Sequence, residues 1–253
     1  MTVGRAATAA GLFTVYSYRG QKLSAMLRRL IPVLAGNRAG AAHEEDNVMS
    51  IVFYAAPQSS ASPVTCVLRE LDVPHERVNV DLSKGEQRKP EFLALNPNGK
   101  VPTLVVNGTP MFEAVAIMQW LGDRFGVEKK LWPAADSPAR LEALSWTTWG
   151  YVQFGYALAL WYQASGERVP KERHNPATAE YAEKELQNLL GLLDARLAKR
   201  AYVLGAEFSL ADLILGGVVN YAKLCGLSIA AHGKLQTWLE RVLSRPSMQN
   251  PWA

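Results

Sequence analysis

The sequence is poor in cysteine, histidine and long hydrophobic runs, and each shortage argues against a class of protein. Cys66 and Cys225 are the only cysteines among 253 residues, and they do not form a Cys-x-x-Cys pair. Two cysteines cannot supply a disulfide framework, so we expect a reducing compartment. The four histidines show no metal-ligand spacing, so no metal site is expected. No run of eighteen apolar residues is present, which argues against a membrane span.

Beyond the first 48 residues, the sequence also lacks a clear excess of positive charge. The chain carries 27 Lys and Arg against 23 Asp and Glu, a net charge of +4. Residues 1–48 hold six of the bases and three of the acids, a net of +3, which leaves 21 bases and 20 acids, a net of +1, for the other 205 residues. The basic pI of about 9.0 therefore gives no reason to expect nucleic-acid binding by the folded body.

Residues 1–48 differ from the rest of the chain in composition. Their bases are mostly arginines spread through Ala, Gly and Leu, and their acids are confined to Glu44, Glu45 and Asp46. An Arg-rich, acid-poor leader is typical of a mitochondrial transit peptide. The alternatives are an appended or misassigned start, with Met49 as the first residue, and a surface helix. On each interpretation we expect most of this segment to be poorly ordered.

From Ile51 onward the pattern predicts a small α/β domain. Ser62 followed by Pro63 predicts an N-cap and the first helical position, and Asn107-Gly108 is a strong hairpin signal. The predicted elements are, in order, the strand Ile51–Tyr54, the helix Ser62–Leu71, the strand Glu76–Val80, the short helix Pro90–Leu95, the strands Thr103–Val106 and Pro110–Phe112, and the helix Glu113–Phe125. This order matches a thioredoxin-like domain, which we assign to residues 49–127.

Strand patterns stop after this domain, and the rest of the chain is predicted to be helical. Helices are expected over residues 137–164, 176–200, 209–224 and 235–243. The third begins with a capping box at Ser209-Leu-Ala-Asp212, in which Asp takes the place of the usual Glu. We assign residues 137–250 to an all-helical domain.

The stretch Asn96-Pro-Asn-Gly-Lys-Val-Pro102 is the most informative in the chain. Pro102 heads a hydrophobic strand, a position where a residue without an N–H is tolerated. A cis bond before Pro102 would leave the amide and carbonyl of Val101 unpaired and pointing outward, an edge that can pair with the backbone of a small peptide. Glu113 then opens a helix whose free amides can hold a carboxylate. Together these features predict a site for a peptide thiol.

These motifs, with the stretches 54–63 and 81–102 and the capping box at Ser209, resemble the glutathione S-transferases. The pattern is most similar to the serine-type transferases of bacteria and plants. The resemblance implies an α/β thioredoxin-like N-terminal domain joined to an all-α helical-bundle C-terminal domain. It also implies a cytoplasmic homodimer, or a mitochondrial one if residues 1–48 are a transit peptide. The implied activity is detoxifying attack of the glutathione thiolate on a small hydrophobic electrophile, with no metal, nucleic acid or membrane as partner.

The resemblance assigns a role in thiol activation to one hydroxyl. A free thiol has a pKa of about 8.5, so a hydroxyl donor and a helix N-terminus are needed to stabilise its anion. The family's catalytic serine matches Ser59, with Ser60 as the neighbouring alternative. Tyr54 is the rival donor, because other branches of the family use a Tyr near the end of the first strand. The serines could instead serve only to cap the helix or turn the chain.

The remaining site residues are also assigned through the resemblance. Val101 and Pro102 are expected to pair with the cysteinyl backbone of glutathione, and Glu113 to meet its γ-glutamyl amino group. The glycine carboxylate is assigned to Gln87, Arg88 and Lys100, for which a solvated surface position is the alternative. The wall of the electrophile pocket is assigned to Tyr151 and Phe154, for which core or dimer packing is the alternative.

One position departs from the family pattern. A Ser usually follows the acidic residue at this helix start, whereas here Ala114 offers only its backbone amide to the γ-glutamyl carboxylate. Losing one hydrogen bond to a charged group costs about 1.5–3 kcal/mol. A catalytically weak binding or scaffold protein is therefore an alternative function. A glutathione-dependent thiol oxidoreductase is a third, although it predicts a cysteine where the first helix of this chain has serines.

Overall fold

The computed structural model describes residues 49–250, which belong to one compact unit that starts at Val48. Residues 1–48, for which a leader or appended segment was predicted, lie outside the described residues. The helices and strands are β1 (Ile51–Ala55), α1 (Ser62–Glu70), β2 (Glu76–Asn79), α2 (Pro90–Leu93), β3 (Thr103–Val106), β4 (Thr109–Phe112), α3 (Ala114–Leu121), α4 (Pro138–Trp149), α5 (Gly155–Ser165), α6 (Pro176–Leu197), α7 (Leu210–Leu224) and α8 (Gly233–Leu243). Short 3-10 turns are η1 (Glu86–Arg88), η4 (Lys171–Arg173) and η5 (Pro246–Met248), and π-helical turns are η2 (Gly122–Gly126) and η3 (Gly150–Phe154).

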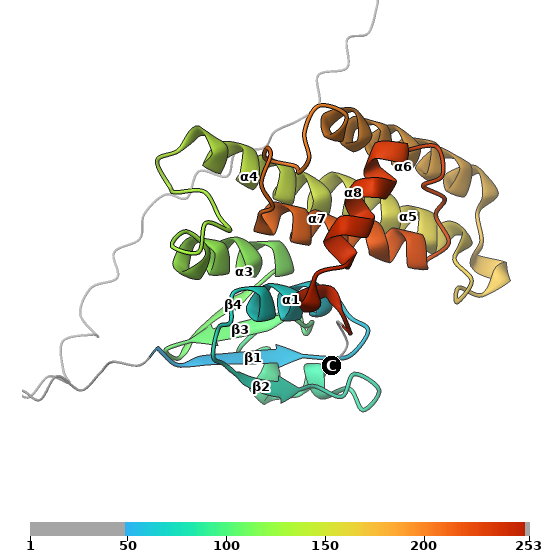
Figure 1. Ribbon diagram of the computed structural model, residues 1–253. Helices are drawn as coiled ribbons and strands as arrows, with labels where there is room; N and C mark the ends of the chain where they lie inside the picture. Colours follow the sequence, from blue (N-terminus) through green and yellow to red (C-terminus); the bar gives the residue numbers. More distant parts are fainter. Residues whose placement is uncertain (1–48, 251–253) are drawn as a thin grey trace, which may run out of the picture. The chain divides into compact units, whose positions relative to one another are not determined.

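The four strands form one mixed sheet in the order β2-β1-β3-β4. β1 is parallel to β2, with Phe53 opposite Arg77, and antiparallel to β3, with Phe53 opposite Leu104. Phe53 and Leu104 are fully buried, because their shared face packs into the hydrophobic core. α1 and α3 lie on the side of the sheet that faces the later helices (Figure 1). The predicted fold class, a thioredoxin-like domain followed by a helical one, is confirmed.

The hairpin between β3 and β4 turns where the sequence predicted. Asn107 and Gly108 both have positive φ values, 48° and 81°, as the tight turn of a two-residue hairpin requires. The side chain of Asn107 also accepts a hydrogen bond of 2.9 Å from the amide of Ser50, which joins the turn to the start of β1.

The helix predicted over residues 137–164 is interrupted. The π-helical turn η3 separates α4 from α5, so an extra residue shifts the helical register at Gly150–Phe154. A Cβ added at Gly150 would lie only 2.4 Å from Cδ2 of Leu215 on α7. Any side chain at Gly150 would therefore force the buried side chain of Leu215 to move.

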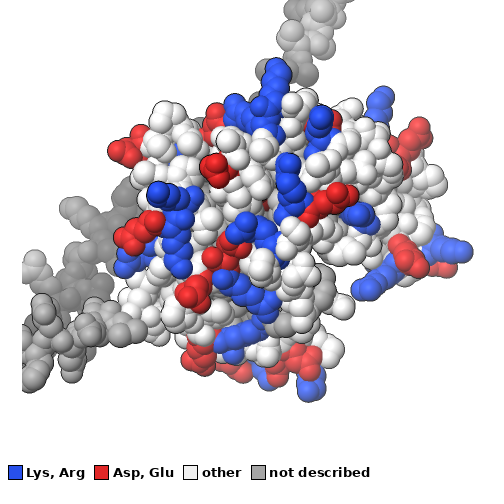
Figure 2. Space-filling model, viewed as in Figure 1, with Lys and Arg blue, Asp and Glu red and all other residues white. Residues whose placement is uncertain are grey.

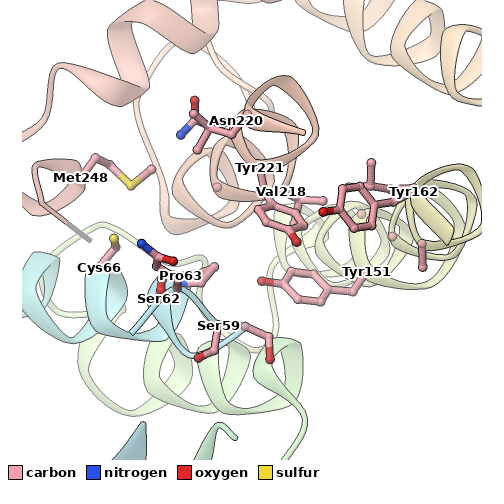
Figure 3. A pocket seen from close by; sticks show the side chains of 18 of the residues that line it. Ser59, Ser62, Pro63, Cys66, Tyr151, Tyr162, Val218, Asn220, Tyr221 and Met248 are labelled. Carbon is pink, nitrogen blue, oxygen red and sulfur yellow. The ribbon is translucent and has the colours of Figure 1, made fainter. Parts of the chain in front are cut away.

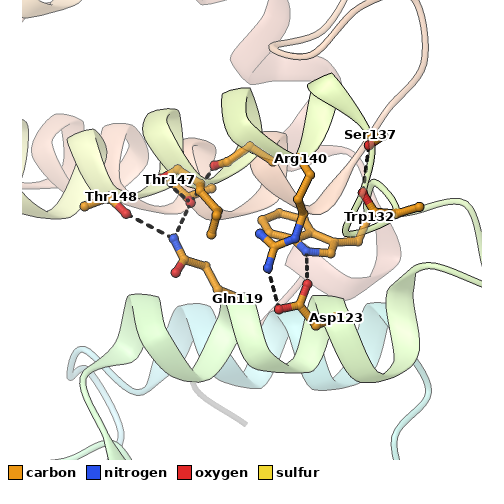
Figure 4. Close-up of polar contacts among 10 residues, drawn as sticks. Gln119, Asp123, Trp132, Ser137, Arg140, Thr147 and Thr148 are labelled. Carbon is orange, nitrogen blue, oxygen red and sulfur yellow. Dashed lines mark hydrogen bonds and ion pairs between the residues drawn. The ribbon is translucent and has the colours of Figure 1, made fainter.

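A set of polar contacts joins α3 of the first half to α4 of the second (Figure 4). The amide of Gln119 donates to the hydroxyls of Thr147 and Thr148 at 2.8 and 3.1 Å. The carboxylate of Asp123 accepts from the indole nitrogen of Trp132 at 2.8 Å and forms an ion pair with Arg140. These contacts fix the two halves relative to each other beside the cavity described below.

Charge on the surface is mixed in sign. Figure 2 shows acidic and basic side chains interspersed over one face of the molecule, without a broad area of either sign. Within residues 49–250, every helix falls short of the combined length and hydrophobicity that a bilayer-spanning helix needs. The same residues contain no group of three His, Cys, Asp or Glu side chains placed to hold a metal ion.

The predicted start of α7 is centred on the buried carboxylate of Asp212. This carboxylate accepts hydrogen bonds from the amide of Ser209 at 2.9 Å, as the capping box requires, and from the Ser209 hydroxyl at 2.9 Å. It also accepts from the amide of Val203 at 2.7 Å and from the indole nitrogen of Trp238 at 2.8 Å. One side chain therefore connects α7, α8 and the segment that precedes α7.

Replacing Asp212 by Ala should lower the free energy of unfolding by at least about 3 kcal/mol, because several buried donors lose their acceptor at once. Urea denaturation of the purified variant measures this loss. Asp136→Ala is the matched control, since Asp136 is exposed, and should change stability by less than about 0.5 kcal/mol. Equal stability of the two variants would contradict the role given to Asp212.

Candidate functional site

Two loops meet at the C-terminal end of β1, and the buried side chain of Asn96 holds one of them in shape. Its amide nitrogen donates to the carbonyl of Lys100 at 2.7 Å and to the hydroxyl of Thr103 at 3.1 Å. Its amide oxygen accepts from the backbone of Asn98 at 3.1 Å. Asn96 is only 2% exposed, so it acts as an internal scaffold for the loop that ends in Val101 and Pro102.

The backbone at Val101 differs in part from the expectation. The Val101–Pro102 bond is cis. The carbonyl of Val101, however, is not unpaired, since it accepts a hydrogen bond of 2.8 Å from the hydroxyl of Ser60. The side chain of Val101 is buried, at 6% exposure, because it packs into the core beneath the loop. The expected free edge is therefore shared with a serine of the other loop.

The two candidate serines have different surroundings. The hydroxyl of Ser59 donates to the carbonyl of Ala56 at 2.7 Å and accepts from the amide of Ala61 at 3.2 Å, so both bonds stay within its own turn. The hydroxyl of Ser60 reaches across to Val101 on the opposite loop. Both serines lie just before α1, where the helix N-terminus favours negative charge.

Tyr54, the rival donor, lies in β1 and is half-buried. Its ring packs edge-on against Phe92 of α2, with 5.9 Å between ring centres. It is not among the described residues that line the cavity below. The structure thus places Tyr54 with the packing between sheet and α2 and not with the serines.

Glu113 and Ala114 stand where β4 passes into α3. Glu113 is exposed and has φ 73°, a left-handed backbone conformation that is uncommon for residues other than glycine. Such conformations cost about 1–3 kcal/mol and cluster at ligand-binding positions. Ala114 is the first residue of α3 and is 5% exposed. The side chain of Ala114 therefore belongs to the core, and only its backbone amide remains to serve a ligand.

The three residues assigned to a carboxylate lie near each other along the loop margin but are unequally placed. Gln87 is half-buried in η1, and its side-chain oxygen is buried without a hydrogen-bond partner. Arg88 is exposed and passes close to Gly99, where its Nη1 lies 3.2 Å from the position of an added Cβ. Lys100 is exposed, at the loop that Asn96 shapes. Arg88 and Lys100 are the two free to reach a ligand.

A cavity of about 390 Å³ opens beside the serines (Figure 3). It lies among the loop before α1, α1 itself, the η3–α5 segment and α7. Its described lining residues are Gln58, Ser59, Ser60, Ser62, Pro63, Cys66, Gly150, Tyr151, Gly155, Leu158, Ala159, Tyr162, Gln163, Gly217, Val218, Asn220, Tyr221, Leu224 and Met248. This volume is within the range of about 300–1,000 Å³ that is typical of small-molecule sites.

The two aromatic residues expected in the pocket wall separate in the structure. Tyr151 lines the cavity. Phe154 does not, since it is 1% exposed and packs against Trp149 with 6.2 Å between ring centres. The π-helical turn explains the difference, because it turns the two residues, three apart in sequence, to different surroundings.

Several lining residues were not anticipated from the sequence. Tyr221 and Asn220 come from α7, and Met248 comes from η5 near the end of the described chain. Ser62, predicted as an N-cap, lies inside α1 as its first residue, and its hydroxyl is buried without a partner. Spacing along one helix cannot reveal these positions, since they depend on how separate helices pack.

Burial sets the ionisation of the cavity's titratable groups. Burial, with a smaller effect from the Cys66 thiol, raises the pKa of Tyr151 well above its ordinary value. Burial likewise raises the pKa of Cys66 to about 11, although Arg69 opposes the rise. At neutral pH, Tyr151 is therefore a hydrogen-bond donor, and Cys66 is a protonated thiol that does not act as a nucleophile.

Glu70 fixes the segment that brings Met248 to the cavity. Its carboxylate forms an ion pair with Arg245 and accepts a hydrogen bond from the hydroxyl of Ser247. Burial alone would raise the pKa of Glu70, but these hydrogen bonds and the charge of Arg245 outweigh it and leave the pKa below its ordinary value of 4.5. The end of α1 thus holds η5 in place.

Replacing Glu70 by Gln should lower stability by about 1.5–3 kcal/mol at pH 7, because hydrogen bonds to a charged group are lost. Since the folded pKa is depressed, the wild-type advantage is complete above the unfolded value near 4.5 and disappears as the pH falls through the lower folded value. Urea denaturation at pH 7 and pH 3 measures both limits. Glu128→Gln, an exposed control, should show no such pH-dependent difference. A constant difference across this range would contradict the assignment.

Comparison with known proteins adds two family matches. The family model for the glutathione S-transferase N-terminal domain matches residues 59–124, and the one for the glutathione S-transferase C-terminal domain matches residues 149–246. The first match contains both serines and the Val101–Pro102 loop, and the second contains the helices that complete the cavity.

Individual relatives cover most of the chain. It is 31% identical to glutathione S-transferase GstB of Escherichia coli K12 over 199 residues, which is 76% of this chain and 91% of the relative. It is 29% identical to the disulfide-bond oxidoreductase YfcG of the same organism over 208 residues, 78% and 92% of the two chains. Among solved structures, the theta class glutathione S-transferase of the citrus canker pathogen Xanthomonas axonopodis pv. citri, with glutathione bound, matches with a TM-score of 0.70 and 26% identity, covering 80% of this chain and 97% of that one.

Proposed function

The chain belongs to the glutathione S-transferase family, and we propose that it joins the glutathione thiolate to a small hydrophobic electrophile. The observation that carries this proposal is the bond of 2.8 Å between Ser60 and Val101. It places a hydroxyl donor beside a backbone edge suited to a peptide, and Ser60 also lines the cavity. A peptide thiol held at this edge would have its sulfur at the cavity mouth.

Glutathione fits the surroundings of Val101 through complementary charges. Its cysteinyl backbone pairs with the amide of Val101 in the manner of an added strand, and the Val101 carbonyl, which accepts from Ser60, has a second lone pair for the ligand. Its γ-glutamyl ammonium lies near the carboxylate of Glu113, and the neighbouring carboxylate takes the backbone amide of Ala114 at the start of α3. The glycine carboxylate is within the range of Arg88 and Lys100. Support for this ligand also comes from the structural relative that was solved with glutathione bound.

Ser60 is the better candidate for thiolate stabilisation. The Ser59 hydroxyl donates its proton to Ala56 within its own turn, whereas the Ser60 hydroxyl donates its proton to the Val101 carbonyl, at the edge where the cysteinyl residue would lie. When glutathione binds, Ser60 exchanges this carbonyl for the nearby sulfur as its acceptor, assisted by the N-terminus of α1. This assignment replaces Ser59 as the first choice and keeps the enzyme in the serine-type group.

The chemistry needs little beyond orientation and thiolate stabilisation. The thiol proton passes to water, and the sulfur bonds to the electrophilic carbon of a molecule in the cavity. A leaving group then departs from that carbon with its bonding electrons, or, in an addition, the electron pair of the attacked double bond moves within the acceptor and a proton is taken up. Holding both reactants in one site accounts for much of the rate gain. The described cavity wall contributes apolar contact and neutral hydrogen-bond donors.

The proposed setting is a cytoplasmic homodimer that acts in detoxification. Exposed apolar side chains on α4 and η3 support a dimer, since Leu141 is 68% exposed and Val152 is 60% exposed in the single chain. The domain division proposed for the enzyme remains residues 49–127 and 137–250, with residues 1–48 as an extension.

A thiol oxidoreductase is the second candidate, favoured by the relative that is named a disulfide-bond oxidoreductase. The cavity offers Cys66 as its thiol, yet that thiol is buried and protonated at neutral pH. Glutathione-dependent reduction of hydroxyethyl disulfide separates the two candidates. Reduction that outpaces conjugation of chlorodinitrobenzene would favour the oxidoreductase.

Glutathione should bind the full chain with measurable heat in a calorimetric titration, and Glu113→Gln should weaken this binding roughly tenfold, because the variant loses the charge that meets the ammonium group. The fold should be unaffected, since the Glu113 side chain is exposed and makes no cap hydrogen bond. Glu91→Gln, on the exposed start of α2, is the control and should bind as the wild type does. Absence of heat at millimolar glutathione would instead indicate a scaffold protein, the alternative that Ala114 favours.

Replacing Ser60 by Ala should lower turnover of chlorodinitrobenzene roughly tenfold or more, while glutathione binding stays within about threefold of wild type. The pH at which the rate is half-maximal should also rise toward about 8.5, the value of a free thiol. Steady-state kinetics across pH 6 to about 9 measure both effects. Ser59→Ala is the matched control, and a larger loss of turnover in that variant would return the role to Ser59.

A further inference from the structure

The chain contains two Asn-Gly pairs, Asn98-Gly99 and Asn107-Gly108, and the structure gives them opposite surroundings. In such a pair the nitrogen of the glycine can attack the side-chain amide of the asparagine, because glycine has no side chain to obstruct ring closure. The attack forms a five-membered succinimide ring and releases ammonia. Which pair reacts in the folded protein therefore depends on how the fold holds each one.

The fold protects the first pair. The backbone amide of Gly99 donates to the carbonyl of Asn96 at 2.9 Å, so the nitrogen that would attack is already engaged. The side-chain nitrogen of Asn98 donates to the side-chain oxygen of Asn96 at 3.1 Å, which anchors the group that would be attacked. Gly99 is also buried, and a Cβ added to it would lie 2.9 Å from the carbonyl oxygen of Gln87. Bonding and crowding both oppose ring closure here.

The second pair is open on the same criteria. Asn107 and Gly108 are both exposed, and a Cβ added to Gly108 would meet only open space. No hydrogen bond within residues 49–250 engages the backbone amide of Gly108. Its nitrogen is therefore free to lose a proton to the solvent and to attack.

A backbone donor also lies at the atom that gains charge in this attack. The amide of Ser50 donates to the side-chain oxygen of Asn107 at 2.9 Å. That oxygen becomes negative when the nitrogen of Gly108 adds to the side-chain carbon. A donor fixed at such an oxygen stabilises the charge as it develops. The amide of Asn107 donates in turn to the carbonyl of Ser50 at 2.9 Å, which holds the two segments together.

We propose that Asn107 is a site of spontaneous deamidation in the folded protein, promoted by the backbone amide of Ser50, and that Asn98 is protected from the same reaction. The products at position 107 are aspartate and isoaspartate. The modification needs no enzyme, since the turn itself supplies both the attacking nitrogen and the donor to the oxygen.

The reaction consumes one water molecule and releases one ammonia. The deprotonated nitrogen of Gly108 bonds to the side-chain carbon of Asn107, and the amide nitrogen takes up a proton and leaves as ammonia with the electrons of the broken bond. Water then adds to one of the two ring carbonyls and opens the ring. Opening at the side-chain carbon leaves aspartate in a normal backbone. Opening at the main-chain carbon leaves isoaspartate, in which the chain runs through the side-chain carbon.

The two products differ in their effect on the hairpin. Aspartate keeps an oxygen that accepts from Ser50 and adds one negative charge to an exposed turn. Isoaspartate lengthens the backbone by one carbon inside a two-residue turn across which Val106 pairs with Thr109. β4 begins at this turn and ends one residue before Glu113. The isoaspartate form should therefore displace the start of α3.

The first experiment measures the reaction in the full chain without a ligand. The protein is incubated in warm, mildly alkaline buffer, and mass spectrometry of its proteolytic peptides follows each asparagine over time. Asn107 should convert at least about tenfold faster than Asn98. In concentrated urea, where neither pair is held by the fold, the two rates should agree within about threefold. Equal rates in the folded protein, or faster conversion of Asn98, would overturn the proposal.

A pair of variants tests the donor. Ser50→Pro removes the backbone N–H at an exposed position before β1, where proline is tolerated. It should slow conversion of Asn107 about fivefold, because one hydrogen bond to the developing charge is lost. Ser50→Ala keeps the N–H and should react as the wild type does. Equal rates in the two variants would overturn the part assigned to Ser50.

The last experiment follows the effect on the glutathione site and rests on the proposed function. Protein aged until most of Asn107 has reacted, with its isoaspartate measured by enzymatic methylation, should bind glutathione at least about threefold more weakly than fresh protein in calorimetry. Asn107→Asp has the added charge but a normal backbone and should bind as fresh wild type does. Unchanged binding by the aged protein would overturn the link between turn and site. Fresh protein that binds no glutathione would refute the proposed transferase function and leave the deamidation site standing.

Discussion

The hydrogen bond from the Ser60 hydroxyl to the Val101 carbonyl is the contact on which the site is built. It connects the loop before α1 with the loop before β3, and its two residues are 41 positions apart in the sequence. Asn96 makes this possible, because its buried amide shapes the second loop from inside. On the proposed function, this bridge sets the Ser60 hydroxyl beside both the peptide edge and the cavity that Ser60 also lines. One hydrogen bond therefore connects the backbone at Val101 with a residue that lines the cavity between α1, α5 and α7.

On the proposed function, the site would stabilise the thiolate with dipoles in place of a nearby cation. The cavity offers a helix N-terminus, serine hydroxyls and tyrosine hydroxyls, all of them neutral dipoles. Dipoles fixed by the fold act strongly on developing charge, since they need none of the rearrangement that solvent dipoles undergo. The acidic and basic groups of the proposed peptide site, Glu113 and Arg88, remain on the outer surface. On the proposed function, recognition of the charged ends of glutathione and bond formation at its sulfur would therefore occupy separate regions.

Local chemistry made much of the fold predictable from the sequence. The Asn107-Gly108 turn and the reciprocal bond between Asp212 and Ser209 depend on neighbours in the chain, so both were found. The choice between Ser59 and Ser60 could not be made, because it depends on a contact with Val101, 41 residues away. Tyr221 and Met248 reach the cavity only through helix packing, and the π-helical turn at η3 leaves no mark in hydrophobic periodicity. The relative positions of segments that are distant in the chain cannot be inferred from a single sequence.

The π-helical turn at Gly150–Phe154 amounts to one residue inserted into an otherwise continuous helix. Each residue of an α-helix advances about 100° around the axis, so deleting one residue here would rotate everything that follows it by that amount. Tyr162 would then leave the cavity, while Tyr151 would stay near its present position. Inserting or deleting a single codon at this point would therefore change which side chains of α5 face the cavity. The other helices and the sheet could keep their arrangement.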